Sequence, residues 1–292
     1  MSAATTIGFR RAQSADRKYV AARRREELRE FGSQLSDDHE LRTCGCVIRK
    51  GRVGSASEVL EVTKSCRCKW LCPTCGHVAS RRAAAQLKRR LLGWTAQGHA
   101  VAFLTLTQGH DSSDRLVALW DRLEHGWAAL VRGSGWTADK QTHGIRGYVR
   151  ITEVVHSATR GWHVHFHVIL LLDRELAQPR LNGLRASVVR RFARGIAHRG
   201  GRTVLDAQDL CPMTPGTEGP LSTYCFKGTT IYRDLDGSRT PMAILDDLES
   251  TGEGLALWDE LTAAVSAARR MQVITSTGID LLCTPGAVTT LD

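Results

Sequence analysis

The sequence contains no long apolar run. No stretch approaches the roughly 20 uninterrupted apolar residues that a membrane-spanning helix needs, and Met1 to Arg11 lack the apolar core of a secretory signal. No internal repeat or low-complexity tract interrupts an ordinary globular composition, in which 42% of the 292 residues are hydrophobic and 24% are charged. We therefore expect a soluble, cytoplasmic protein that has no membrane partner and folds as one large domain or two small ones.

Acidic residues are also in short supply. The 30 Asp and Glu residues face 40 Lys and Arg residues, which gives a formal net charge of +10. Such an excess favours a polyanionic partner, because each cation placed on a nucleic-acid phosphate releases a condensed counterion. A basic protein without such a partner has the same composition, so the charge alone does not decide between the two.

The nine cysteines do not follow the pattern of a secreted disulfide scaffold. Their number is odd, the chain is long, and several lie too close in sequence to bridge one another. Six fall between Thr43 and His77, where Cys72 and Cys75 form a C-P-x-C arrangement. Because this tight turn lets two thiolates converge on one ion, we expect a small zinc knuckle, with His77 as a weaker candidate ligand. The remaining three are expected to be ordinary buried thiols: Cys211, Cys225 and Cys283.

Hydrophobic periodicity predicts a mixture of helices and strands. Helices are expected over Asp16–Phe31, Val78–Trp94, Leu116–Leu130, Ser222–Gly228 and Pro241–Met271, and in a long segment interrupted near Pro179 and ending at about His198. Strands are expected over Ala100–Thr107, Gly147–Val155 and Trp162–Leu172, the last two as a hairpin, whereas Asp206–Pro220 is expected to be a loop. This order predicts an α+β fold with a central, mostly antiparallel sheet and flanking helices.

The sharpest local motif is a set of three histidines at alternate positions, His163, His165 and His167. Alternate residues of a strand point to the same face, so the three imidazoles project together while Val164 and Phe166 enter the core. Each buried neutral histidine would need its own hydrogen-bond partners, and chelation of a divalent ion by two of them is the simpler account. Polar histidines on a wetted sheet face are the alternative.

Glu153 lies on the neighbouring predicted strand. From there it can supply a carboxylate oxygen to the same ion and leave positions open for water and a phosphate group. The alternative is a carboxylate on a solvent-facing position, because the register of the two strands is not fixed by the sequence.

These residues resemble a known family, the His-hydrophobic-His (HUH) endonucleases, and within it the class 1 replication initiators of rolling-circle plasmids, including those of actinomycete plasmids. A strand like Ala102–Thr107 forms the first family motif, and Gly161–Leu170 (GWHVHFHVIL) looks like the second. Tyr224–Lys227 matches the third, a tyrosine followed three residues later by a lysine. The resemblance runs from the cysteine knuckle to the segment around Trp258–Ile279 and implies an HUH-like fold.

The resemblance implies an enzyme that nicks one DNA strand. His165, His167 and Glu153 would bind Mg²⁺ or Mn²⁺, with His163 as a further candidate ligand. Tyr224 would attack in line and keep the 5′ phosphate, which leaves a free 3′-OH for the host polymerase. Lys227, three residues on and hence on the same helix face, would stabilise phenolate or phosphate charge.

Tyrosine is scarce, which narrows the choice of nucleophile. Tyr148 is on a predicted strand and Tyr19 precedes the knuckle, so Tyr232 is the only serious rival to Tyr224. Initiators of this kind place a glutamate shortly before the tyrosine to activate water for termination. This sequence has glycine, proline and leucine there, and the nearest acid is Glu218.

The resemblance also implies a ligand set for zinc and a set of DNA contacts. Cys44 and Cys66 would complete the Zn²⁺ site with Cys72 and Cys75, and Cys46 and Cys68 are alternative ligands. The knuckle and the basic helix after it would grip plasmid origin DNA, single-stranded or supercoiled, through Arg81, Arg82, Lys88, Arg89 and Arg90. A host helicase and polymerase would be further partners.

Four parts of the chain follow from this interpretation: an N-terminal helical segment (1–42), the zinc knuckle with its basic helix (43–95), the nicking domain (96–235) and a C-terminal helical segment (236–292). Three other functions compete with it. A relaxase or single-strand transposase would use the same histidines and tyrosine. A non-catalytic zinc-ribbon regulator would explain the cysteines and the charge but not the histidines, and a hydrolase of small substrates would explain the histidines but not the knuckle.

Overall fold

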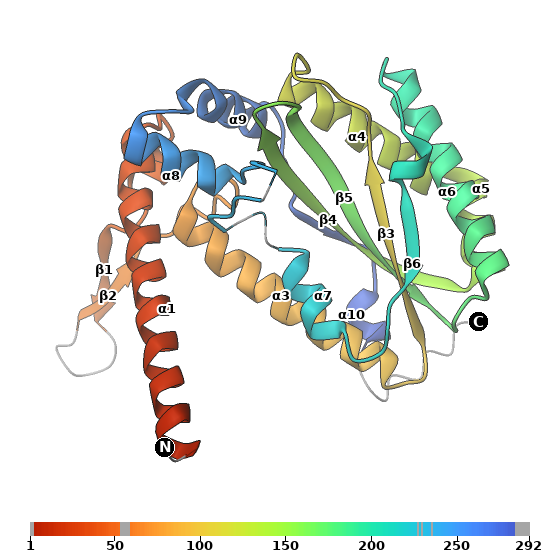
Figure 1. Cartoon of the computed structure of the whole chain (residues 1–292), viewed down its shortest axis with the longest axis horizontal. Helices are drawn as coiled ribbons and strands as arrows, with labels where there is room; N and C mark the ends of the chain where they lie inside the picture. The colour runs from red at the N-terminus through yellow and green to blue at the C-terminus, as the bar shows by residue number, and fades with distance from the viewer. Residues whose placement is uncertain (1–2, 53–58, 227, 229, 235, 284–292) are drawn as a thin grey trace.

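A central five-stranded sheet organises the molecule (Figure 1). The structure, a computed structural model, describes residues 3–52, 59–226, 228, 230–234 and 236–283. The strands lie in the order β6-β3-β5-β4-β7, and every neighbouring pair is antiparallel. Their bounds are β3 Ala100–Thr107, β4 Ile145–Ser157, β5 Gly161–Leu172, β6 Asp209–Pro212 and β7 Val273–Thr275. The predicted α+β class with a central antiparallel sheet and flanking helices is therefore confirmed.

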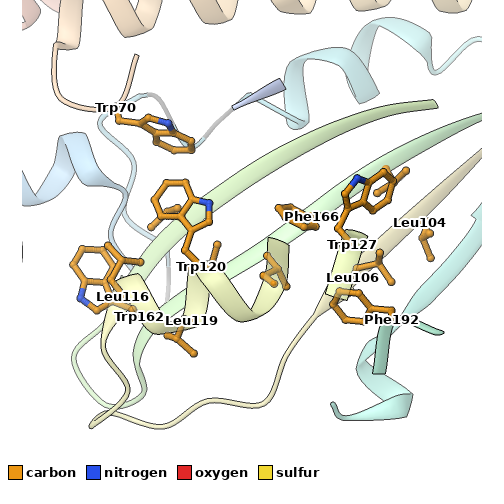
Figure 2. Close-up of a cluster of buried hydrophobic side chains, with 14 of the residues drawn as sticks. Trp70, Leu104, Leu106, Leu116, Leu119, Trp120, Trp127, Trp162, Phe166 and Phe192 are labelled. Atoms are coloured by element: carbon orange, nitrogen blue, oxygen red, sulfur yellow. The ribbon is translucent and has the colours of Figure 1, made fainter. Parts of the chain in front are cut away.

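One face of the sheet is covered by three helices, α4 (Leu116–Val131), α5 (Gly133–His143) and α6 (Gln178–His198). Apolar residues recur along α4 at helical spacing, so Leu116, Leu119, Trp120, Leu123 and Trp127 all face the sheet and are buried. Figure 2 shows Trp120 and Trp127 among the side chains of β3, β5 and α6 in this core. The buried Arg150 of β4 lies on this face, where its guanidinium donates to both carboxylate oxygens of Glu124 of α4 and stacks on Phe166. The face is therefore a packed core with one internal ion pair.

The other face is covered in part by α3 (Pro73–Thr95), α7 (Glu218–Tyr224) and α10 (Ile279–Leu282). Leu87, Leu91 and Trp94 of α3 pack there against Val149 and Ile169 of the sheet. This smaller core lies toward one end of the strands, because the alternating positions change from apolar residues to histidines along β5. The change in side-chain chemistry positions the candidate site beside α7.

Most of the remaining elements lie around one end of the sheet (Figure 1). The long helix α1 (Ala3–Gln34) packs against α3 and α8, and α2 (His39–Arg42) leads into the hairpin of β1 (Val47–Arg52) and β2 (Val59–Thr63). Helices α8 (Pro241–Thr251) and α9 (Leu255–Ala267) complete this group. The short helix η1 (Leu205–Ala207) lies elsewhere, between α6 and β6, where Arg185 of α6 donates to the carbonyl of Leu205. No helix in the part of the chain that the structure describes is both long and apolar enough to cross a membrane.

Four sequence-based boundaries were wrong. The expected loop 206–220 contains strand β6, and the helix expected at 222–228 begins at Glu218 and ends at Tyr224. Pro179 does not interrupt a helix but lies in the first turn of α6, where its missing N–H costs nothing. The segment 241–271 is two helices, separated where Gly252 and Gly254 adopt positive φ of 77° and 97°.

The contact between α4 and α6 predicts opposite effects for two glycines of one helix. A Cβ at Gly195 would lie 2.7 Å from Ala129 Cβ and 2.8 Å from Gly126 Cα, whereas a Cβ at Gly183 meets nothing within 4 Å. Gly195→Ala is therefore expected to lower the free energy of unfolding by about 1–3 kcal/mol through overpacking. Gly183→Ala should raise it by up to about 1 kcal/mol through helix propensity. Urea titration of both variants measures the difference, and equal effects would contradict the close packing of the two helices.

Candidate active site

Three histidines project from the sheet face that α3 and α7 only partly cover. On β5 the residues between them, Val164 and Phe166, are fully buried against α4. Because side chains alternate along a strand, His163, His165 and His167 share the opposite face. The predicted projection of the three imidazoles from one face is confirmed.

Glu153 joins two of these histidines. In the β4–β5 ladder Glu153 is directly opposite His165, which settles the register that the sequence left open. Its Oε2 atom lies 2.9 Å from His165 Nε2 and 2.8 Å from His167 Nε2, and the two Nε2 atoms are 3.1 Å apart. Three ligand-type atoms from two strands thus converge on one point.

The charge of Glu153 makes this point attractive to a cation. Burial by itself opposes ionisation of the carboxyl, but the hydrogen bonds from His165 and His167 outweigh it and hold its pKa well below the usual range. Glu153 is therefore a carboxylate at neutral pH, although its side chain is almost completely buried. A buried negative charge between two imidazoles is the electrostatic arrangement of a divalent-ion site.

The three donor atoms fit such an ion. Two neighbouring ligands of a six-coordinate ion at about 2.1 Å are about 3.0 Å apart, and the three separations here are 2.8, 2.9 and 3.1 Å. Two imidazoles and one carboxylate on one side of an ion leave its other positions open to water and substrate.

His163 is placed differently from its two neighbours. Its Nε2 atom is 2.8 Å from the hydroxyl of Thr107, and its ring stacks on His110 with centroids 4.9 Å apart. Burial, followed by the nearby His165 and His110, lowers the pKa of His163 to about 3, so the ring is neutral. The structure groups Glu153, His165 and His167 and leaves His163 outside that group.

Tyr224 lies beside the same group. It is the last residue of α7, 47% exposed, and its ring centroid is 5.5 Å from that of His167. The next two residues, Cys225 and Phe226, are buried in the core under α3 and fix the end of the helix. A Cβ at Gly228 would lie 3.4 Å from Glu153 Cγ, so the chain passes directly over the carboxylate. Lys227, the other predicted residue of this motif, lies outside the described residues.

The two other residues considered for catalysis have different surroundings. Tyr232 directly precedes the β-bridge between Arg233 and Arg239, and its N–H donates to the Thr240 hydroxyl while its carbonyl accepts from the Thr240 N–H. Glu218 begins α7 and is buried, and its Oε1 accepts a hydrogen bond of 3.3 Å from Thr95 of α3. The structure therefore gives Tyr224 the contact with the histidines and gives Glu218 a place in the packing of α7.

Four cysteines form a second cluster. The Sγ atoms of Cys44, Cys66, Cys72 and Cys75 all lie within 4.8 Å of one another, and Cys44 Sγ is 3.8 Å from that of Cys72 and 3.6 Å from that of Cys75. Sulfur ligands 2.3 Å from a tetrahedral zinc ion are about 3.8 Å apart, so the four fit that ion. Cys46 is exposed, and Cys68 lies outside the group of four.

The Cys72 thiol is poised to act as a thiolate. Its hydrogen bond with Cys66 outweighs the effect of burial and, with the N–H of Cys75, lowers the pKa of Cys72 to about 6. Because Cys72 is also the N-cap of α3, an ion held there would be joined directly to the basic helix.

The five predicted DNA-contacting cations lie on different sides of α3. Lys88 faces α7, where its Cε is 3.7 Å from a Cβ placed on Gly219. Arg82 and Arg90 line a groove beside the cysteine cluster, and Arg90 pairs with Asp280 at 2.7 Å. Arg81 and Arg89 are exposed. The helix therefore presents positive charge to two flanks rather than one.

Comparisons with known proteins show what the chain is similar to. A family model described as "Replication protein" matches residues 57–179. A neomycin resistance protein of Streptomyces cyanogenus is 30% identical over 127 residues, which are 35% of this chain and 29% of the relative. A protein named rep from Streptomyces lividans is 26% identical over 154 residues, 44% of this chain and 33% of the relative. The chain thus spans about a third of the length of these relatives, and no solved structure matches it.

Proposed function

Because residues 57–179 match a family model described as "Replication protein", we propose that this chain is a plasmid replication initiator that nicks and rejoins one DNA strand through Tyr224. The family match supports the replication-initiator part of the resemblance found in the sequence, and the matched range contains Glu153, His165 and His167. Tyr224 lies outside the matched range, so its role depends on the geometry.

The observation that carries the proposal is the position of Tyr224 beside the Glu153, His165 and His167 cluster. A scissile phosphate placed on this cluster would lie within reach of the Tyr224 hydroxyl, which attacks phosphorus as the bond to the 3′ oxygen breaks. The phosphate then stays on Tyr224 as a phosphotyrosine, and the departing oxygen takes a proton to become a 3′-OH. Because the new bond is also a phosphodiester, the strand can be rejoined by the reverse reaction.

Each side chain of the cluster has a defined task in this reaction. Glu153, His165 and His167 would hold Mg²⁺ or Mn²⁺, which supplies Lewis-acid polarisation of the phosphate and offsets charge on the departing oxygen. The two imidazole donors favour Mn²⁺, because Mg²⁺ prefers oxygen ligands. Lys227 would stabilise negative charge on the phenolate or the phosphate. His163 would keep its hydrogen bond with Thr107 of the neighbouring strand and would not bind the ion.

The cysteine cluster and the basic helix support binding of DNA. Cys44, Cys66, Cys72 and Cys75 would hold a structural Zn²⁺, and this zinc knuckle would fix the start of α3. Arg81 and Lys88, seven residues apart on one helix face, would contact the backbone of origin DNA on the side of Tyr224. Arg82 and Arg89, also seven residues apart, would contact it on the flank of the groove beside the cysteines. A host helicase and polymerase would use the open strand and its 3′-OH.

A nicking assay tests this function. Wild-type protein is incubated with Mn²⁺ and a supercoiled plasmid that carries the DNA flanking its gene. The proposal predicts nicked circles with protein covalently attached to the new 5′ end, and no reaction in EDTA. Nicks without attached protein would contradict the tyrosine mechanism, and DNA binding without any nick would favour a non-catalytic regulator.

Glu153→Gln separates the role of the carboxylate from that of the fold. The substitution keeps the size and shape of the side chain but removes its negative charge between His165 and His167. We therefore expect at least about a 10-fold weaker affinity for Mn²⁺. Nicking should recover in part as Mn²⁺ is raised. Electron paramagnetic resonance titration measures free Mn²⁺, and Glu253→Gln, an exposed position, is the matched control. Unchanged Mn²⁺ affinity in Glu153→Gln would rule out this cluster as the ion site.

A further inference from the structure

A small apolar pocket adjoins Tyr224 on the side of the sheet edge. Its volume is about 340 Å³, and strand β6, strand β3 and helix α7 form its walls. Phe103, Met213 and Leu221 line it with half-buried apolar side chains, and the Tyr224 ring closes one side. The polar side chains that line it are two threonines, Cys211 and Tyr224, and none of its lining residues is an acid or a base of the Asp, Glu, Lys, Arg or His type.

The pocket is continuous with the candidate active site. Phe103 stacks on His167 with centroids 5.2 Å apart, and His167 in turn contacts the Tyr224 ring. In the ladders Phe103 is opposite Cys211 of β6, and Thr105, two residues further on, is opposite His167. The pocket and the histidines therefore share one face of the sheet.

The chemistry of the pocket fits a nucleobase better than a phosphate or an ion. Uncharged, apolar walls provide no positive charge to bind a phosphate, whereas the flat faces of a base stack on aromatic and apolar side chains. Its walls are an edge strand and a short helix, so only a base that has left its duplex can enter.

We propose that this pocket holds the base of the nucleotide whose 5′ phosphate is transferred to Tyr224; this inference rests on the proposed function. In an in-line attack the departing 3′ oxygen lies opposite the tyrosine, so the nucleotide upstream of the nick is directed away from Tyr224. The nucleotide downstream remains bound to Tyr224 through its phosphate and is the one that lies next to the pocket. The pocket therefore selects an unpaired base at the position directly after the nick.

Abasic oligonucleotides test whether the effect of removing the base depends on an intact pocket. Once the nick site is mapped, the single-stranded substrate is compared with one that lacks only the base directly after the nick. We expect the abasic substrate to lower kcat/KM of the wild-type enzyme by about 5- to 150-fold, the range of base stacking. In Met213→Ala and Leu221→Ala the abasic substrate should lower kcat/KM by less than about 3-fold, because these variants lack a side chain against which the base packs. Leu255→Ala, an exposed apolar position on α9, is the control and should keep the wild-type penalty.

A fluorescence measurement tests binding of the base in the pocket without requiring the enzyme to cleave DNA. Tyr224→Phe is titrated onto an oligonucleotide with 2-aminopurine directly after the nick site, and quenching by stacking is expected to fall in the Tyr224→Phe, Met213→Ala double variant. Quenching equal in both, or an abasic penalty that is the same in pocket variants and wild type, would overturn the pocket. Failure of the proposed nicking function would appear separately and earlier, as the absence of any covalent adduct with the wild-type protein when the nick site is mapped, and it would remove this inference with it.

Discussion

Tyr224→Phe is expected to abolish the covalent protein–DNA adduct and to lower the rate of nicking by a factor on the order of 10³ or more. The substitution removes one hydroxyl and leaves the ring that packs 5.5 Å from His167. Because the hydroxyl is the proposed nucleophile, the phenylalanine ring that replaces Tyr224 has no group that can form a bond to the phosphate. Single-turnover cleavage of an end-labelled oligonucleotide, resolved on a denaturing gel, measures both quantities.

Tyr232→Phe is the matched control for this experiment. Its hydroxyl is removed in the same way, but its backbone contacts with Thr240 are untouched, so nicking should continue at nearly the wild-type rate. Loss of the adduct in Tyr232→Phe and its persistence in Tyr224→Phe would exchange the two assignments. Affinity for DNA should be similar in both variants, which distinguishes lost chemistry from lost binding.

Cys72→Ser is expected to release the zinc ion and unfold the region around the start of α3. Cys72 is buried, lies 3.8 Å from Cys44 and caps the helix, so one substitution removes a ligand and disturbs the cap. Structural zinc sites bind with apparent free energies of about 10–16 kcal/mol, which is a large share of the stability of a small knuckle. Metal analysis by plasma mass spectrometry and a thermal melt report the loss.

Cys46→Ser is the control for the zinc site, because Cys46 lies in the same segment but is exposed and outside the cluster. It should keep one zinc per chain and the wild-type melting temperature. Zinc lost from Cys46→Ser and retained in Cys66→Ser would replace the proposed ligand set with the alternative one.

The main strands could be predicted from the sequence because their side-chain patterns are local. Strand β3 has the predicted bounds, and β4 and β5 extend the predicted hairpin by a few residues. Strands β6 and β7 could not be predicted, since they have four and three residues and pair only through distant partners. Helix α5 begins within a Gly-Ser-Gly sequence of low helix propensity, and packing against α6 and β4 stabilises it.

The candidate site could be predicted where it depends on strand alternation. The period of two placed His165 and His167 on one face, and the hairpin brought Glu153 opposite them. The contact of Tyr224 with His167 depends on how α7 packs against α3, which no local pattern contains. Spacing alone left six candidate cysteines, whereas the family resemblance named Cys44, Cys66, Cys72 and Cys75, the four that the folded chain brings together.

The division of the chain into four parts stays a prediction. Strand β7, from the segment assigned to the C-terminal part, completes the central sheet beside β4. Helix α1, from the N-terminal part, packs against α3 and α8. Truncations at the predicted boundaries would therefore remove elements that the sheet and its helices contact.

The identity of the tyrosine attached to DNA tests the central claim most directly. The two candidates fall in different tryptic peptides, because cleavage after Arg202 and Lys227 gives 203–227 with Tyr224, and cleavage after Arg233 gives 228–233 with Tyr232. The covalent adduct formed in Mn²⁺ is digested with nuclease and trypsin and analysed by mass spectrometry. We expect the nucleotide remnant on Tyr224 in peptide 203–227; a remnant on peptide 228–233, or on any residue other than Tyr224, would contradict the proposed mechanism.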